Sequence, residues 1–278
     1  MQENEKLPDV QNTKVDSISI NRVGVTRISF PLTIYNKEGK VQSIHAKINI
    51  YGSLPKSQRG TNMSRYLEIL MDFKDQPLDS SNLRKFLLAL IKRVETKDIY
   101  TEIEFKYFIE KQSPVSKKTG IQSYSCTLIG RLQYTIYSYV LKVVVPLTSV
   151  CPCSKEISKF GAHNQRGYVT VQIQFDKNKS MLIEDIVKLV EGQGSCEVYP
   201  ILKRPDEKWV TETGYKNPKF VEDICRGVAT ELQTRKEIKK FKIKVENFES
   251  IHDHNAVSFI FRKRKGSRWV SDDGGSVI

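Results

Sequence analysis

The sequence predicts an α+β protein in which one ββααββ module occurs twice in tandem, each with an antiparallel sheet covered by helices on one face. Three observations predict this fold class. Segments with alternating apolar and polar residues come in pairs, as expected for neighbouring antiparallel strands. Segments with apolar residues at spacings of three and four lie between these pairs, as expected for amphipathic helices. The same order of elements then recurs, which predicts one domain at residues 1–132 and a second at 133–278.

The first module follows a polar N-terminal segment, residues 1–16, that we expect to be a tail or to pack against another surface. Turn-forming residues, Asn36–Gly39, join its first two strands. Ser80 is the expected N-cap of its second helix, in which Leu83, Phe86, Leu87, Leu90 and Ile91 form an apolar stripe. The predicted elements are strands at 20–35 and 41–51, helices at 63–73 and 80–94, and strands at 99–108 and 122–132.

The second module repeats this order with longer connections. In its fifth element, Phe241, Ile243 and Val245 alternate with charged residues and are predicted to point inward. A long interruption, residues 192–215, separates its two helices. The predicted elements are strands at 133–147 and 166–175, helices at 183–191 and 217–234, and strands at 240–247 and 255–262.

The formal net charge of +13 predicts an anionic partner, which charge alone leaves open as nucleic acid, an acidic membrane surface or a polyphosphorylated small molecule. The compact basic cluster Arg262–Lys265 is interpreted as a solvated strand end. Five cysteines, an odd number, and a polar start without an apolar signal segment argue against a secreted disulfide scaffold. The longest apolar run, residues 139–147, is too short to span a bilayer. We therefore expect a reduced, cytoplasmic protein without a membrane partner.

Metal-type residues gather in two stretches of the second module. Cys151–Arg166 (CPCSKEISKFGAHNQR) and Glu249–His254 (ESIHDH) together hold three of the four histidines. Thiolate and imidazole are ligands that zinc and iron prefer. The alternative is that the two cysteines are small buried thiols and the histidines are surface residues. Each candidate falls where a strand or helix is predicted to end, which is the usual place for residues of a functional site.

If Cys151, His163 and His252 converge, they supply three protein ligands and leave a position for water, as in a catalytic metal site. Such a site would acidify the water towards neutral pH. Glu197 and Glu249 are candidates for an exchangeable fourth ligand or a general base, and the alternative for each is a solvated surface charge.

Two further residues, Cys153 and His254, follow Cys151 and His252 by two positions. They would lie on the same side as these partners if the backbone is extended, and would then serve in proton transfer or simply pack. Basic residues in two other loops suit phosphate, with exposed charges as the alternative. These residues are Lys203 and Arg204 in YPILKRPDEK, and Arg59 and Arg65 in RGTNMSR.

Four separated blocks, in this order, together resemble the GTP cyclohydrolase type IB family: RGTNMSRYLE, CPCSKEIS with GAHNQRG, GQGSCEVYPILKRPDEKWVTE, and ENFESIHDHNAV. The resemblance spans residues from about 9 to 265. It implies the tunnelling fold, in which two ββααββ modules stand in tandem and subunits join edge to edge into barrels. One small departure is Asn62, where some relatives have histidine.

The resemblance implies hydrolysis of GTP to formate and 7,8-dihydroneopterin triphosphate, the entry to tetrahydrofolate synthesis. It implies a divalent metal, variously zinc, manganese or iron, and no organic cofactor. Glu212 would anchor the purine, with Glu207 as a nearby competitor for this role. The family's expected assembly is a homotetramer with active sites near subunit interfaces. The implied metal ligands are Cys151, His163, Glu197 and His252; Glu249, Cys153 and His254 lie beside the metal; and Lys203, Arg204, Arg59 and Arg65 meet the triphosphate.

Three alternatives remain. An archaeal relative uses iron and yields the cyclic phosphate of dihydroneopterin, but we favour the triphosphate product. A basic, metal-stabilised nucleic-acid-binding protein would need aromatic residues among basic ones on an exposed sheet face. Tyr137 and Tyr139 share one strand face, which we instead interpret as core or subunit interface, so no nucleic-acid partner is expected. The third is another tunnelling-fold enzyme acting on a pterin or deazapurine.

Overall fold

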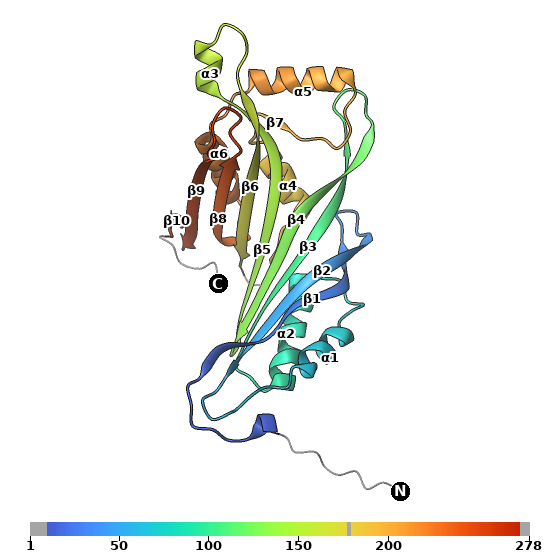
Figure 1. Cartoon of the computed structure of the whole chain (residues 1–278), viewed down its shortest axis with the longest axis vertical. Helices are drawn as coiled ribbons and strands as arrows, with labels where there is room; N and C mark the ends of the chain where they lie inside the picture. The colour runs from blue at the N-terminus through green and yellow to red at the C-terminus, as the bar shows by residue number, and fades with distance from the viewer. Residues whose placement is uncertain (1–9, 177–178, 273–278) are drawn as a thin grey trace. The chain divides into compact units, whose positions relative to one another are not determined.

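The computed structural model describes residues 10–176 and 179–272 (Figure 1). The chain divides into two compact units. Among the described residues, unit 1 comprises 10–35, 41–103 and 129–139, and unit 2 comprises 36–40, 104–128, 140–176 and 179–272. Three long strands, β3, β4 and β5, contribute residues to both units. The predicted domain boundary at 132/133 follows the repeat of elements along the chain, and it stays a prediction.

The predicted α+β order of elements is confirmed, with additions in the second half. The strand order is β1-β2-β3-β4-β5-β6-β8-β9-β10, and β7 pairs with β5. The elements are η1 (Val10–Asn12), β1 (Ile20–Tyr35), β2 (Val41–Leu54), α1 (Ser64–Asp72), α2 (Ser80–Val94), β3 (Asp98–Gln112), β4 (Thr119–Gln133), β5 (Ile136–Val150), α3 (Pro152–Ile157), β6 (Asn164–Phe175), α4 (Ile183–Glu191), β7 (Cys196–Glu197), α5 (Arg204–Lys216), α6 (Val221–Gln233), β8 (Ile238–Asn247), β9 (Ala256–Lys265) and β10 (Arg268–Ser271).

In unit 1, the β1–β2 hairpin is antiparallel and helix α2 provides much of the apolar core. Its predicted stripe is confirmed except at Ile91, which is half-buried, while Val94 is buried. The predicted cap at Ser80 is wrong. Asp79 is the N-cap, because its backbone is extended and its carboxylate accepts a hydrogen bond from Asn82 N at 2.8 Å. The interpretation of the Tyr137 and Tyr139 face as core rather than an exposed aromatic platform is supported, since the Tyr137 hydroxyl donates to Ser80 O at 2.7 Å and Tyr139 is buried.

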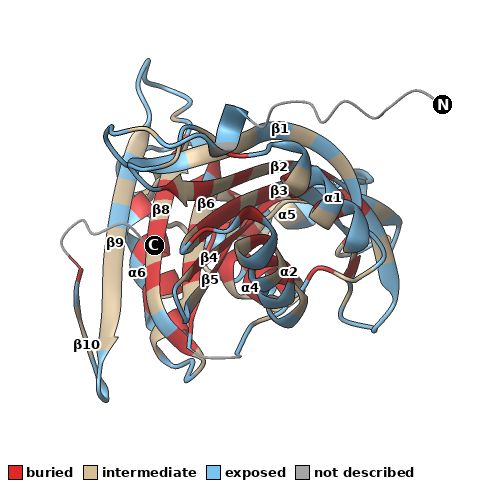
Figure 2. Ribbon diagram, turned by 90° about the horizontal axis from the view of Figure 1, so that it is seen from below, coloured by how far each residue is buried: buried red, intermediate tan, exposed pale blue. Residues whose placement is uncertain are grey.

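In unit 2, strands β5, β6, β8 and β9 form an antiparallel ladder, and buried residues run along β6 and β8 (red in Figure 2). The inward positions predicted for β8, Phe241, Ile243 and Val245, are fully buried. Helices α4 and α6 cover this core with their own buried stripes. These strands and helices form a rigid base for the connections that carry the candidate site.

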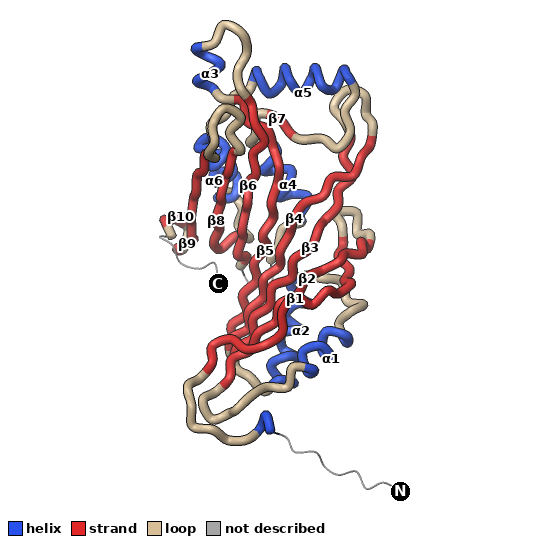
Figure 3. The backbone as a smooth tube through the Cα atoms, in the orientation of Figure 1, coloured by secondary structure: helices blue, strands red, loops and turns tan. Residues whose placement is uncertain are grey.

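Two expectations for unit 2 are corrected. The predicted interruption at 192–215 contains a helix, α5, which Figure 3 shows together with α3 beyond one end of the strands. The basic cluster at the end of β9 is not simply solvated, because β10 partners it. Lys263 Nζ lies 2.9 Å from Asp272 Oδ1, and the Arg264 guanidinium lies 4.7 Å from the centre of the Trp269 ring.

Within residues 10–176 and 179–272, no helix is both long and apolar enough to cross a bilayer. All five cysteines are free thiols.

Candidate functional site

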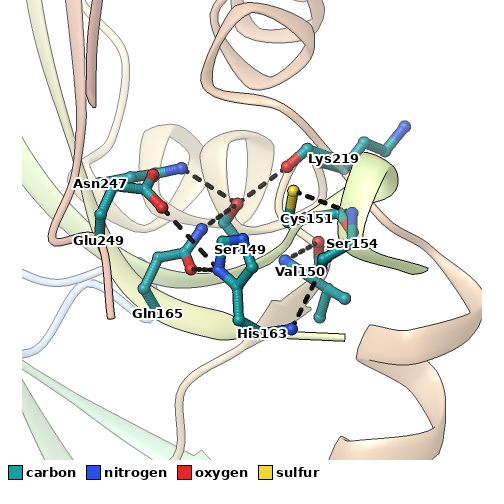
Figure 4. Close-up of polar contacts among 10 residues, drawn as sticks. Ser149, Val150, Cys151, Ser154, His163, Gln165, Lys219, Asn247 and Glu249 are labelled. Atoms are coloured by element: carbon teal, nitrogen blue, oxygen red, sulfur yellow. Dashed lines mark hydrogen bonds and ion pairs between the residues drawn. The ribbon is translucent and has the colours of Figure 1, made fainter. Parts of the chain in front are cut away.

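The connection between β5 and β6 folds back on itself and brings Cys151 next to His163. Cys151 is the N-cap of α3, and its Sγ accepts a hydrogen bond from Ser154 N at 3.4 Å. Its backbone N–H donates to His163 O at 3.1 Å, and His163 N donates to Ser154 Oγ at 3.1 Å. Figure 4 shows these side chains at the ends of the two strands. A thiol and an imidazole, apart in sequence, are therefore fixed by backbone hydrogen bonds at one place.

A chain of buried hydrogen bonds sets the orientation of the His163 ring (Figure 4). Ser149 Oγ donates its one proton to Lys219 O at 2.8 Å, so it accepts from Gln165 Nε2 at 3.3 Å. This turns Gln165 Oε1 towards His163 Nδ1, 3.0 Å away. Because an amide oxygen only accepts, His163 Nδ1 carries a proton, and in the neutral ring the lone pair is then on Nε2. A histidine held in this way is prepared to bind a metal through Nε2.

The segment after β8 adds a carboxylate to this cluster. Asn247 Nδ2 donates to Ser149 Oγ at 3.0 Å, which fixes the end of the strand. Two residues later, Glu249 Oε2 lies 4.0 Å from His163 Nδ1, and only 11% of its side chain is exposed. Glu249 therefore lies beside His163, and its place beside a metal stays a prediction.

The two histidines of the β8–β9 connection are exposed, and their rings stack with centroids 4.9 Å apart. His252 and His254 therefore lie side by side, although their backbone forms bends rather than extended chain. Cys153 behaves differently, because it lies in helix α3 rather than in extended chain, and it is exposed. The condition under which Cys153 would share a side with Cys151, an extended backbone, is therefore not met.

Glu197 lies in the short strand β7, where it contacts a buried ion pair. Lys111 Nζ lies 2.9 Å from Glu197 Oε2 and 2.7 Å from Glu191 Oε1. Tyr124 Oη also donates to Glu191 Oε1, at 2.9 Å. Burial raises the pKa of Glu191, and the neighbouring Lys111 charge opposes this effect.

Burial separates the other cysteines from the candidate site. It raises the pKa of Cys126 to about 12 and that of Cys196 to about 11, so both remain thiols at neutral pH. Cys225 is also buried, and its pKa is raised by the same cause. Since metals bind the thiolate, Cys151 and Cys153 are the cysteines whose exposure suits a ligand.

Helix α5 is fixed to the β3–β4 connection by Asp206, whose carboxylate is fully buried. It accepts hydrogen bonds from four donors at 2.6–2.8 Å: the backbone N–H groups of Val115, Ser116 and Lys203, and the Ser116 hydroxyl. Burial opposes ionisation of this group, yet these hydrogen bonds hold the pKa of Asp206 below its usual range. The N-terminus of α5 is thus tied to the neighbouring loop.

Further along α5, Glu212 lines a cavity of about 320 Å³. Glu212 and its competitor Glu207 are both exposed, but Glu207 does not line this cavity. Other residues of the lining come from the end of β5 and from the segment around His163: Thr148, Val150, Gly161, Ala162 and Asn164. A cavity of this size is at the lower end of the roughly 300–1,000 Å³ range of small-molecule sites. Glu212 is therefore better placed than Glu207 to contact a ligand near His163.

The four basic residues predicted for phosphate belong to different units. Lys203 and Arg204 are exposed at the start of α5 in unit 2. Arg59 and Arg65 belong to unit 1, where Arg65 Nη1 donates to Arg93 O at 3.1 Å. Their shared role stays a prediction.

The donors present fit a borderline divalent metal, because a thiol, an imidazole with a free Nε2 and carboxylates occur in one unit. In the part of the chain that the structure describes, however, no three Cys, His, Asp or Glu side chains are grouped closely enough to hold an ion. Convergence of Cys151, His163, Glu197 and His252 therefore stays a prediction.

Sequence reasoning missed the supporting residues. Ser149 and Gln165 carry a signal, because they are polar residues at inward positions of otherwise apolar strands. Lys111 and Glu191 carry no such signal, since their contact joins distant parts of the chain.

Comparison with known proteins gives a consistent result. Residues 7–258 match the family described as type I GTP cyclohydrolase folE2. The chain is 46% identical over 262 residues to GTP cyclohydrolase FolE2 of Azoarcus sp. (strain BH72), covering 93% of this chain and 96% of the relative. It is 43% identical over 260 residues to GTP cyclohydrolase FolE2 of Methylobacillus flagellatus, covering 93% and 97%.

Among solved structures, uricase from Arthrobacter globiformis aligns with a TM-score of 0.53 at 9% identity, covering 92% of this chain and 97% of the uricase. Urate oxidase from Bacillus subtilis aligns with a TM-score of 0.50 at 7% identity, covering 89% and 99%. At such low identity these matches concern the fold alone, and they confirm the predicted tunnelling fold.

Proposed function

The chain belongs to the type I GTP cyclohydrolase FolE2 family, and from this premise we propose that it hydrolyses GTP to formate and 7,8-dihydroneopterin 3′-triphosphate. This reaction is the first step of tetrahydrofolate synthesis. The observation that carries the proposal is local: the backbone-fixed pair Cys151 and His163 lies on the same segment that lines the cavity of Glu212. A ligand in this cavity would meet the candidate metal donors.

Cys151, His163, Glu197 and His252 are proposed to hold one divalent ion, which is zinc, manganese or iron(II). The orientation of His163 by Gln165 supports its part in this set. When bound, such an ion supplies a Lewis acid that lowers the pKa of a water molecule. No organic cofactor is proposed.

The remaining candidate residues have proposed roles in binding and proton transfer. Glu212 accepts hydrogen bonds from the N1–H and the 2-amino group of guanine, which a carboxylate can receive in pairs. Glu249, His254 and Cys153 exchange protons while the imidazole ring of guanine opens, since several titratable groups are useful there. The triphosphate is met by Lys203 and Arg204, with Arg59 and Arg65 contributed by the same or another subunit.

The reaction uses these groups in sequence. One water adds to C8 and opens the ring, and a second water releases C8 as formate. Closure of the new ring onto the ribose carbons then returns one water. The net charge of +13 attracts a substrate with about four negative charges.

A homotetramer with active sites near subunit interfaces and a cytoplasmic location are further parts of the proposal. Gel filtration tests the assembly, because elution at half or twice the tetramer mass contradicts it.

The activity is tested by incubating the metal-reconstituted protein with GTP and measuring pterin fluorescence after oxidation. We expect pterin from the wild type and none from Cys151→Ala or His252→Ala. Phosphate analysis of the product separates the triphosphate from the cyclic phosphate. The absence of pterin with zinc, manganese and anaerobic iron(II) would contradict the proposal.

A further inference from the structure

Unit 2 contains a buried ion pair between two elements that are distant in the sequence. Lys111, in β3, and Glu191, the last residue of α4, contact each other at 2.7 Å. Their side chains are only 11% and 8% exposed. Removing two charges from water costs several kcal/mol per ion, and well-packed apolar residues often stabilise such a position more. A buried pair of this kind therefore invites a functional explanation.

The pair is held rigidly from other sides. Tyr124, in β4, donates its hydroxyl to Glu191 Oε1 at 2.9 Å. The Lys111 ammonium also lies 4.7 Å from the centre of the Tyr199 ring, within the range of a cation–π contact. The position of the Lys111 charge is thus fixed by Glu191 and Tyr199.

From this position Lys111 also contacts a third charged side chain, that of Glu197. Its Nζ lies 2.9 Å from Glu197 Oε2, and 40% of the Glu197 side chain remains exposed. One cation between two carboxylates leaves the trio with a net charge of −1. An ionised carboxylate has about four acceptor positions, so a single contact from Lys111 leaves room for another ligand.

We propose that Lys111 and Glu191 are positioning residues. Lys111 orients the Glu197 carboxylate towards a divalent cation, and Glu191 balances the positive charge of Lys111, so that the negative charge of Glu197 remains available to the cation. This inference rests on the proposed function, in which Glu197 is a metal ligand. Residues that orient a ligand in this way affect metal affinity by about 10- to 100-fold.

The test is a cobalt(II) titration of the full-length, metal-free protein, with affinity measured by competition with a chromophoric chelator. The cobalt absorption spectrum reports the ligand set independently of activity. Lys111→Met is expected to weaken binding about 10- to 100-fold and to change the spectrum, whereas Lys111→Arg keeps the charge and retains binding within a few-fold. Lys106→Met, on the same strand, is the matched control and is expected to bind cobalt as the wild type does.

Glu191→Gln separates orientation from charge. It keeps the shape of the side chain but leaves Lys111 paired with Glu197 alone, so we expect weaker cobalt binding, by about 10-fold or more. A purely structural role for the pair would lower the thermal midpoint of the metal-free variants and leave cobalt affinity and spectrum unchanged, and this result would overturn the inference.

Glu197→Gln distinguishes a failure of the positioning inference from a failure of the proposed metal set. If it loses cobalt affinity while Lys111→Met does not, the positioning inference is wrong and the metal set stands. If wild type and Glu197→Gln bind cobalt equally, the proposed metal set is wrong, and the positioning inference fails with it.

Discussion

The two halves of the chain share one order of elements and differ in the connections between them. The first pair of strands is joined by the turn at residues 36–40, whereas the corresponding pair β5 and β6 is joined by residues 151–163, which include α3. The helices α1 and α2 are joined by residues 73–79, whereas α4 and α6 are separated by residues 192–220, which include β7 and α5.

The longer connections carry the candidate chemistry. Cys151 and His163 bound the first of them, Glu197 and Glu212 lie in the second, and Glu249 with the stacked histidines lies in the β8–β9 connection. In the first half, the β1–β2 turn takes the place of the β5–β6 connection. It is closed by local hydrogen bonds, in which Asn36 Oδ1 accepts from the backbone N–H groups of Glu38 and Lys40. The repeated strands and helices thus form the apolar core, while the inserted connections carry the candidate reactive groups.

The largest difference is expected between two histidines at the second strand of each half. His163 directly precedes β6, whereas His45 is exposed within β2. Loss of a metal ligand removes several kcal/mol of Lewis-acid stabilisation, so His163→Ala is expected to lower kcat/KM for GTP by roughly 1,000-fold and to reduce bound metal. His45→Ala is expected to stay within about twofold. Equal effects of the two substitutions on activity and metal content would contradict a role for His163 as a metal ligand.

A smaller loss is expected within α5, the helix that has no counterpart in the first half. Glu212→Gln weakens a charged hydrogen bond to guanine worth about 1.5–3 kcal/mol, which corresponds to roughly 10- to 100-fold in kcat/KM. Glu207→Gln is the matched control on the same helix, and we expect little change. Inosine triphosphate lacks the 2-amino group, so the penalty of Glu212→Gln is expected to be smaller with it. A larger loss from Glu207→Gln than from Glu212→Gln would indicate that Glu207, rather than Glu212, binds the guanine.

The two halves also differ in how an aspartate caps a helix. Asp206 is buried with four donors, whereas Asp79 caps α2 through one backbone N–H. Because the pKa of Asp206 is lowered in the folded state, its contribution to stability is present above the ordinary aspartate value of about 3.9. It is lost as the pH falls through the lowered folded pKa. Asparagine caps helices about as well as aspartate, so Asp79→Asn is expected to change little.

The measurement is the thermal midpoint of both variants and the wild type from pH 7 to pH 3. We expect a clear deficit for Asp206→Asn at pH 7 that narrows below about pH 4. A deficit that stays constant over this range would show that the charge of Asp206 is not what stabilises α5.

Sequence patterns predicted the repeated elements well because their burial follows simple periods. The α2 stripe at Leu83, Leu87 and Leu90 and the β8 alternation at Phe241 and Ile243 are both buried as predicted. Helix α5 was not predicted, because burial along it follows no such period. Only Asp206 and Gly214 are buried, and no apolar stripe marks the helix. Its Pro205 and the acidic first turn were the available signals.

The candidate site was predicted less completely. Residue types alone pointed to Cys151 and His163, and the β5–β6 connection places them together. The supporting contacts depend on register and long-range packing, as for Lys111 and Glu191, which periodicity does not encode.

The smallest expected difference concerns one buried hydroxyl in each half. Ser149 Oγ joins Lys219 O, Gln165 Nε2 and Asn247 Nδ2, whereas the buried Thr101 Oγ1 donates to the single carbonyl of Asn49 at 2.8 Å. Ser149→Ala leaves two buried amide groups without an acceptor and is expected to cost about 1–3 kcal/mol.

Thr101→Val removes one ordinary hydrogen bond and keeps the shape of the side chain, so we expect a cost of about 1 kcal/mol. Urea denaturation of both variants measures the two values. Ser149→Ala has a second consequence, because the Gln165 amide is then free to rotate and no longer fixes the proton on His163 Nδ1. Cobalt affinity should therefore fall in Ser149→Ala and not in Thr101→Val. A loss of stability in both variants with unchanged cobalt affinity would show that Ser149, like Thr101, only stabilises the fold.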